Sequence, residues 1–172
     1  LHDALPISVS AADANTVYVS TTGGKILKTS DGGANWTNAY EAPSSGINAV
    51  DIADANTAYV AGSGGTMLKT TNGGASWTAL TSGTTASFYA ISVGDANTVY
   101  AGGAIGTIVK TTDGGTNWTA QTSGTTHEIR SMKFLDANTG YATGNNGTIL
   151  KTTNGGANWT AQTSGTTEVL EN

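Results

Sequence analysis

The 172-residue sequence contains no cysteine, which excludes disulfide bonds, thiol catalysis and metal sites built from thiolates. Basic residues are also scarce: seven lysines and arginines stand against twelve acidic residues, and the formal net charge is −5. Nucleic-acid binding calls for a basic stripe, so we exclude nucleic acid as a partner. No apolar run approaches the roughly 18 residues that span a bilayer, so we expect no membrane insertion.

The two histidines cannot form a metal site without further histidine or cysteine ligands, and we expect neither metal nor cofactor. Charged residues make up only 11% of the chain, while glycine occurs 24 times. This composition fits many short strands joined by tight turns. Alternating apolar runs recur throughout the chain, which argues against disorder.

The most informative feature is a fixed period of 41 residues. The tryptophans follow it, at Trp36, Trp77, Trp118 and Trp159. The tetrapeptide Asp-Ala-Asn-Thr follows it too, at 13–16, 54–57, 95–98 and 136–139. A period in this range indicates a repeat architecture, in which each unit buries its apolar face against its neighbours.

One repeat, residues 47–87, divides into four strand patterns. Residues 47–53 alternate apolar and polar side chains, and Asp54-Ala-Asn-Thr57 predicts a turn. Strands are expected at 58–61, 66–70 and 77–81, separated by glycine-rich turns. Four short antiparallel strands per unit are typical of a propeller blade. A β-solenoid is the rival architecture, but its coils are usually shorter.

We therefore predict an all-β fold, a β-propeller segment of four antiparallel four-stranded blades that forms an incomplete ring. The expected repeats are residues 8–46, 47–87, 88–128 and 129–169. Residues 1–7 resemble the translation of a sequencing-library adapter, so we expect a non-native leader on a metagenomic fragment. Residues 170–172 are expected to begin a further repeat, because Leu170 corresponds to Ile129. An open arc leaves unpaired blade edges, which predicts self-association.

The segment from Thr29 to Trp36 resembles the Asp-box, or BNR repeat, of pattern Ser/Thr-x-Asp-x-Gly-x-x-Trp. The positions that match it are Thr29, Asp31, Gly33 and Trp36; Thr70, Asn72, Gly74 and Trp77; Thr111, Asp113, Gly115 and Trp118; and Thr152, Asn154, Gly156 and Trp159. An Asp or Asn oxygen is expected to accept turn amides, with the indole covering the hairpin. In the family this hairpin lies on the face opposite the binding site, so the resemblance implies a structural role.

The wider unit, seen in 147–156 and 159–167, is similar to the repeats of the photosystem II stability/assembly factor family. Such units also occur in secreted bacterial proteins. The resemblance implies a propeller that binds a protein partner and catalyses nothing. The photosynthetic members use an arginine-rich patch for their partner, whereas Arg130 is the one arginine of this sequence. We therefore expect a secreted or cell-surface bacterial relative, acting outside the cytoplasm.

Sialidases share the Asp-box, but their clamp of three arginines cannot be built here. A glycosidase with two carboxylates needs only a pair roughly 5–9 Å apart, so glycan hydrolysis stays open as an alternative. Six of the twelve acids occupy predicted turns or Asp-boxes, and Asp3 lies in the predicted leader. We expect no enzymatic activity.

Candidate ligand contacts fall where one repeat departs from the others. They are Tyr40, Glu41, Tyr89, His127, Glu128 and Arg130. Ordinary loop variation, with Glu128 and Arg130 paired in solvent, is the competing interpretation. Phe88 aligns with Ile47 and Ile129 and is expected in the core. The periodic lysines Lys28, Lys69, Lys110 and Lys151 are expected on a solvated strand face.

These observations favour a non-catalytic propeller module that serves as a binding or scaffold unit, with an unidentified protein or glycan as partner. Two alternatives remain, a glycan-active hydrolase with a sialidase-like fold and an assembly chaperone of the photosystem II type.

Overall fold

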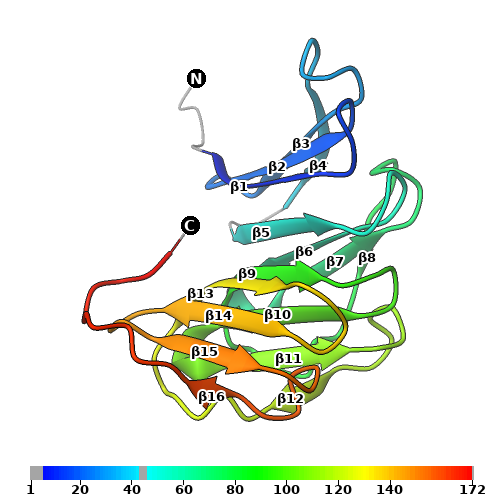
Figure 1. The fold of residues 1–172 in the computed structure, drawn as a ribbon. Coiled ribbons are helices and arrows are strands. Elements are labelled where there is room, and N and C mark those ends of the chain that lie inside the picture. The colour runs from blue at the N-terminus through cyan, green and yellow to red at the C-terminus, as the bar shows by residue number, and fades with distance from the viewer. Residues whose placement is uncertain (1–5, 43–45, 172) are drawn as a thin grey trace.

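The computed structural model describes residues 6–42 and 46–171, which form four antiparallel four-stranded sheets (Figure 1). The predicted all-β class and four-blade architecture are confirmed. Residues 1–5 of the predicted leader and Asn172 of the predicted further repeat lie outside the described residues. Pro6 and Ile7, the last two leader positions, belong to the first strand.

Blade 1 contains β1 (Pro6–Ala11), β2 (Val17–Thr21), β3 (Lys25–Thr29) and β4 (Thr37–Glu41). Blade 2 contains β5 (Ile47–Ile52), β6 (Ala58–Gly62), η1 (Ser63–Gly65), β7 (Met67–Thr70) and β8 (Thr78–Ala79). Blade 3 contains β9 (Phe88–Val93), β10 (Val99–Gly103), η2 (Ala104–Gly106), β11 (Ile108–Thr111) and β12 (Thr119–Gln121). Blade 4 contains β13 (Ile129–Phe134), β14 (Gly140–Gly144), β15 (Ile149–Thr152) and β16 (Thr160–Ala161).

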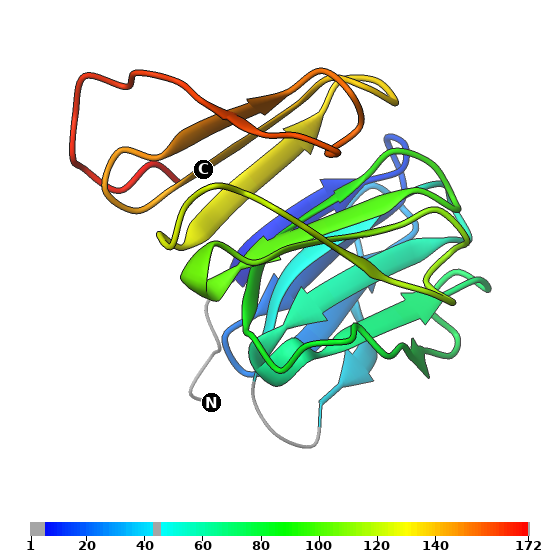
Figure 2. The same cartoon turned by 90° about the horizontal axis from the view of Figure 1, so that it is seen from below.

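Each blade is a meander in which consecutive strands pair in chain order. The first strands of successive blades contact one another, β1 with β5, β5 with β9 and β9 with β13. The last strand of each blade forms its outer edge, and the sheets lie face against face (Figure 2). No described strand joins two blades into one sheet, and the four blades form an open segment of a propeller.

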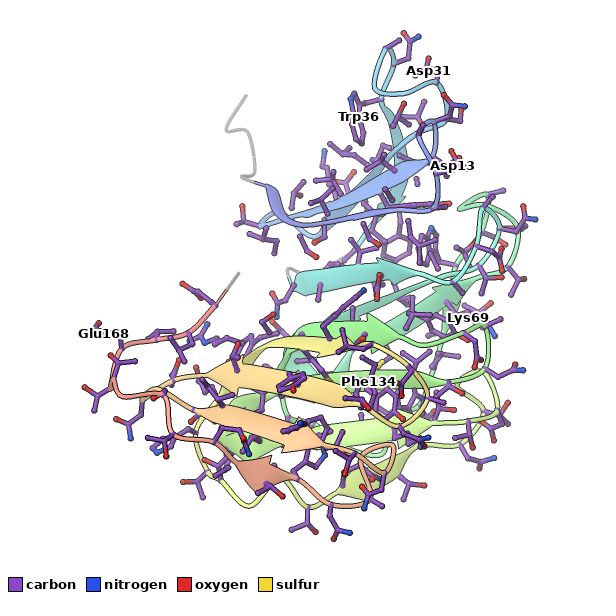
Figure 3. The ribbon with its side chains drawn as sticks, viewed as in Figure 1. Asp13, Asp31, Trp36, Lys69, Phe134 and Glu168 are labelled. Carbon is purple, nitrogen blue, oxygen red and sulfur yellow. The ribbon has the colours of Figure 1, made fainter. Side chains whose placement is uncertain are left out.

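The Asp-Ala-Asn-Thr turns and the tryptophan hairpins share one side of the molecule, which we call the hairpin face. Asp13 shows why the turn forms: its Oδ1 accepts the backbone amides of Asn15 at 2.7 Å and Thr16 at 2.8 Å. Gly32 then donates its amide to the Asn15 carbonyl at 3.1 Å, which joins turn and hairpin. Glu168 lies on the opposite side, the loop face (Figure 3).

The hydrophobic core lies between blades, because the two faces of each sheet are covered only by neighbouring sheets. Three buried clusters join blades 1 and 2, blades 2 and 3, and blades 3 and 4. Phe134 of blade 4 stacks on Tyr100 of blade 3 with ring centroids 3.6 Å apart. Phe88 is fully buried, as predicted. In the ranges that the structure describes, no helix has the length and apolarity to cross a membrane.

The prediction of a solvated face is wrong for three of the four periodic lysines. Lys28, Lys69 and Lys110 are half-buried and reach across to the next blade. Their Nζ atoms donate to the carbonyls of Gly73, Gly114 and Gly155 at 2.7, 3.0 and 2.8 Å, respectively. Each ammonium also lies 5.1–5.5 Å from the ring centroid of a tyrosine on its own blade. The lysines therefore tie adjacent blades together.

Candidate functional site

A β-bulge occupies the same register position in the first strand of every blade. The pairing of first and second strands skips one residue in each case, which leaves Ile7, Asn48, Tyr89 and Arg130 without a cross-strand partner. Bulges bend a strand and redirect a side chain, and they are frequent beside functional sites. The four bulged residues are 41 positions apart, yet they differ completely in chemistry.

These bulged residues line one cavity of about 440 Å³, which lies along the first strands of the four blades, β1, β5, β9 and β13. Ile7, Asn48, Tyr89 and Arg130 all line it, together with Glu171, the next position in the same 41-residue series. The remaining lining is contributed by neighbouring residues of β1, β5, β9 and β13, such as Ala49 and Ala90. The volume falls in the range of small ligand sites in proteins.

Arg130 is held in one orientation by three groups. Its guanidinium lies over the ring of Tyr89, with Cζ 4.7 Å from the ring centroid. Its Nη2 donates to Glu128 Oε2, and its Nε donates to Asn145 Oδ1 at 3.2 Å. Asn145 Nδ2 completes the triangle by donating to the same Glu128 oxygen at 3.0 Å. The ion pair is only about one-third exposed, so the arginine, the tyrosine and the carboxylate form a preorganised surface.

The backbone around Glu128, just before blade 4, is fixed by Gly144 of that blade. A Cβ at Gly144 would lie 1.8 Å from the Glu128 carbonyl oxygen, so only glycine permits this approach. Asn145 donates its amide to that carbonyl at 3.0 Å. His127 is exposed beside this contact, with Nε2 3.1 Å from Asn146 Nδ2. His127 therefore extends the surface of Glu128 and Arg130 along the loop face.

Tyr40 and Glu41 lie elsewhere. Both belong to the outer strand β4 of blade 1. Tyr40 packs against Trp77 at the interface with blade 2, with ring centroids 6.3 Å apart. Glu41 forms an exposed ion pair with Lys25 at 3.5 Å. The structure thus brings four of the six predicted contacts together, and these two are not among them.

The hairpins predicted as Asp-boxes are closed by side-chain bonds. In the first, Gly33 donates its amide to Thr29 Oγ1 at 2.9 Å, and that hydroxyl donates to Asp31 Oδ1 at 2.7 Å. Asn35 donates its side-chain amide at 2.7 Å and its backbone amide at 2.9 Å to the same carboxylate. These bonds lower the pKa of Asp31 to about 2, the side chain of Asn35 having the largest effect.

The equivalent carboxyl of Asp113 also has a pKa of about 2, chiefly through the backbone amide of Asn117. In the second hairpin the backbone N–H of Ser76 donates to Asn72 Oδ1 at 3.0 Å. The side-chain oxygen of Asn72 therefore takes the place of the aspartate carboxylate as acceptor. Trp77 packs at the interface between blades 1 and 2. It meets Tyr18 of the preceding blade edge-to-face, with ring centroids 6.1 Å apart.

The titratable groups of this surface are few. Glu171 is the one carboxylate among the described residues that line the cavity. Over the same part of the chain, no group of three or more histidine, aspartate or glutamate side chains is placed to hold a metal ion.

Sequence reasoning missed Ile7, Asn48, Asn145 and Glu171. For three of them a signal exists, since Ile7, Asn48 and Glu171 share the register position of Tyr89 and Arg130. Divergent chemistry at one position of an otherwise regular repeat marks the cavity. Asn145 carries no comparable signal, because its role depends on contacts across the loop.

A family model described as photosynthesis system II assembly factor YCF48 matches residues 2–133. A search of curated protein sequences finds no match.

Several solved structures share the fold. A structure of YCF48 bound to a D1 peptide is 18% identical, with a TM-score of 0.61, over 92% of this chain and 82% of that chain. YCF48 from Cyanidioschyzon merolae is 19% identical, with a TM-score of 0.70, over 94% of this chain and 60% of that one. An ancestral GH74 enzyme is 23% identical, with a TM-score of 0.73, over 91% of this chain but 24% of its own length. At these identities the likeness concerns the fold alone.

Proposed function

The chain belongs to the photosynthesis system II assembly factor YCF48 family, and from that premise we propose that it is a non-catalytic module that binds a segment of a protein partner. The proposed binding surface is the loop-face cavity with Tyr89, His127, Glu128 and Arg130. One observation carries the proposal: four of the six residues singled out for departing from the repeat meet at the bulged positions and the adjoining loop.

The chemistry of this surface suits a peptide. Tyr89 and Arg130 are residue types that dominate the binding energy of many protein interfaces. Their stacked arrangement is fixed before binding, which lowers the entropy cost of complex formation. Asn48 uses its side-chain amide on the Phe88 carbonyl at 2.7 Å, which leaves its side-chain oxygen as an acceptor for a ligand.

Selection from a phage-displayed library of random peptides tests the proposal. We expect peptides that bind the purified chain and lose at least tenfold in affinity when Tyr89→Ala and Arg130→Ala are combined, about 1.4 kcal/mol or more. Thr153→Ala, an exposed change on the hairpin face of the same blade, is the matched control and should leave binding unchanged. Peptides that bind the Tyr89→Ala/Arg130→Ala double variant as tightly as the wild-type chain would place the binding site elsewhere.

Photosystem assembly is a second candidate, supported by the family itself. A YCF48 structure contains a D1 peptide, so that peptide is the direct probe. Against this role, Arg130 is the single arginine and is already paired with Glu128. We therefore expect the D1 peptide to bind weakly or not at all. Binding as tight as that of the selected peptides would favour the photosystem role.

Glycan hydrolysis is the third candidate, since the chain shares its fold with GH74 enzymes. A hydrolase of the usual kind needs two carboxylates across the scissile bond. The described cavity lining offers Glu171 alone. One of the similar GH74 structures is a xyloglucanase, so xyloglucan is the probe. Release of reducing sugar from it, abolished by Glu171→Gln, would favour an enzyme over a binding module.

We also propose that the protein acts outside the cytoplasm, at the cell surface or after secretion. The proposal rests on the resemblance of its repeats to those of secreted bacterial proteins. Fractionation of the native cells with an antibody to this chain tests it, and an exclusively cytoplasmic signal would contradict it.

A further inference from the structure

Ile105 combines two unfavourable properties in one residue. Its side chain is 74% exposed, and its backbone has a left-handed φ of 55°. A β-branched residue with positive φ is an outlier, because its side chain crowds the backbone. The equivalent positions of blades 2 and 4 carry Gly64 (φ 63°) and Asn146 (φ 56°), residue types that adopt this conformation more readily. Stability alone therefore favours glycine or asparagine where blade 3 has isoleucine.

The loop that contains Ile105 imposes this conformation. Ala104 donates its amide to the Ser87 carbonyl at 2.8 Å, which ties the loop to the start of blade 3. A Cβ at Gly106 would lie 2.0 Å from the Thr125 carbonyl oxygen, so the loop also packs closely on the segment before blade 4. Backbone strain persists where the surrounding structure over-determines it, and such positions cluster at ligand contacts. The loop therefore holds Ile105 in a fixed, exposed position.

Ile105 borders a shallow depression of about 720 Å³ on the loop face. Residues 105–108 and 120–127 line it, and Ala120 and His127 are exposed within that lining. Apolar side chains therefore lie beside the hydroxyl and amide groups of threonine, serine and glutamine. Ligand sites commonly combine apolar surface with a few polar groups that fix the ligand's orientation. This lining suits one apolar side chain of a ligand together with the polar groups of its backbone.

The depression is continuous with the peptide-binding surface proposed above. His127 lines the depression and also extends the surface of Glu128 and Arg130. The loop η2, which contains Ile105, contacts β13, the strand that contains Arg130. A peptide that lies on Tyr89 and Arg130 and continues over His127 therefore meets Ile105. This continuity identifies the occupant of the depression as a further part of the same partner segment.

We propose that Ile105 is a second anchor for the partner segment, and that this segment carries an aliphatic or aromatic side chain that packs on Ile105 in the depression. The inference rests on the proposed peptide-binding function and adds the chemistry of the partner to it. Burial of Ile105 in the complex removes apolar surface from water. The gain in the complex offsets what the exposed side chain and the left-handed backbone cost the free chain.

Isothermal titration calorimetry with peptides selected on the wild-type chain tests this inference. Ile105→Asn should bind them about tenfold more weakly, because the apolar contact is lost. This variant should still fold, since Asn146 has the same backbone conformation. Ile105→Val keeps the branched Cβ and most of the apolar surface, so it should bind within about fourfold of the wild type. Leu135→Asn is the matched control: Leu135 is 70% exposed beside a turn of the hairpin face, and its change should leave affinity unaltered.

Alanine scanning of the same peptides identifies the side chain that meets Ile105. Replacing one apolar peptide residue should weaken binding about tenfold in the wild-type chain but less than about threefold in the Ile105→Asn chain, where that contact is already lost. An Ile105→Asn chain that binds as tightly as the wild type, or a scan without such a residue, would overturn the inference. The proposed function would still stand if the Tyr89→Ala/Arg130→Ala chain loses affinity, and it fails if that chain binds as tightly as the wild type.

Discussion

The lysines that bridge the blades provide a quantitative test of how this repeat protein is stabilised. Lys69→Met keeps most of the apolar stem but removes the ammonium that lies 3.0 Å from the Gly114 carbonyl and 5.1 Å from the Tyr59 ring centroid. Gly114 is buried, so its carbonyl loses a charged donor that water replaces poorly.

A hydrogen bond to a charged group contributes roughly 1.5–3 kcal/mol, and a cation–π contact about 0.5–1 kcal/mol. Because Lys69 is partly exposed, we use the lower limits, which give a loss of about 2 kcal/mol. For a chain of this size that corresponds to a fall in Tm of about 4–8 °C. Lys151→Met is the matched control, since among the described residues the Lys151 ammonium has only the contact with the Tyr141 ring.

Thermal unfolding followed by circular dichroism measures both variants, at a concentration low enough to keep the chain monomeric. We expect Lys69→Met to lower Tm by several degrees and Lys151→Met to lower it by less than half as much. Equal effects would show that the bond to the next blade contributes nothing, which would refute the reasoning.

Three further changes test other parts of the fold. Ile105 has a left-handed φ of 55°, as Asn146 has at the equivalent position of the next repeat (φ 56°). This backbone conformation costs a β-branched residue about 1 kcal/mol. Urea titration should therefore show the Ile105→Asn chain to be more stable by that amount. Phe134→Ala removes the ring stacked on Tyr100 and should cost about 3–5 kcal/mol in the same titration; a loss below 1 kcal/mol would contradict the interblade core. The folded-state pKa of Asp113 is lowered to about 2. Its stabilising effect is therefore fully present above the unfolded pKa of about 3.9 and is lost as the pH falls through 2. Asp113→Asn should weaken the dependence of Tm on pH between about pH 4 and 2, and an unchanged slope would contradict this.

The sequence was enough to predict the blades and their strands, because the period and the alternation of apolar residues are set by packing between identical units. It was not enough to place Lys69, since a strand position that faces the next blade looks the same in sequence as one that faces solvent. The long lysine stem is buried while its charge meets a backbone carbonyl, and residue types do not encode that carbonyl.

The candidate site was predicted in part for a related reason. Tyr89 and Arg130 differ visibly from the surrounding repeat, but the β-bulge that turns them into one cavity is a shift of backbone register. Such a shift leaves no pattern of its own in the sequence. Tyr40 departs from the repeat just as clearly, yet it packs against Trp77 between two blades.

The most direct test of the binding proposal replaces the divergent residues by those that other repeats carry at the same positions. The variant combines Tyr89→Asn, His127→Ala, Glu128→Ser and Arg130→Asn, and its affinity for the selected peptides is measured by isothermal titration calorimetry. We predict a chain with wild-type strand content and an affinity at least tenfold lower, about 1.4 kcal/mol or more. Undiminished peptide affinity in the folded variant would contradict the claim that departures from the repeat form the binding site.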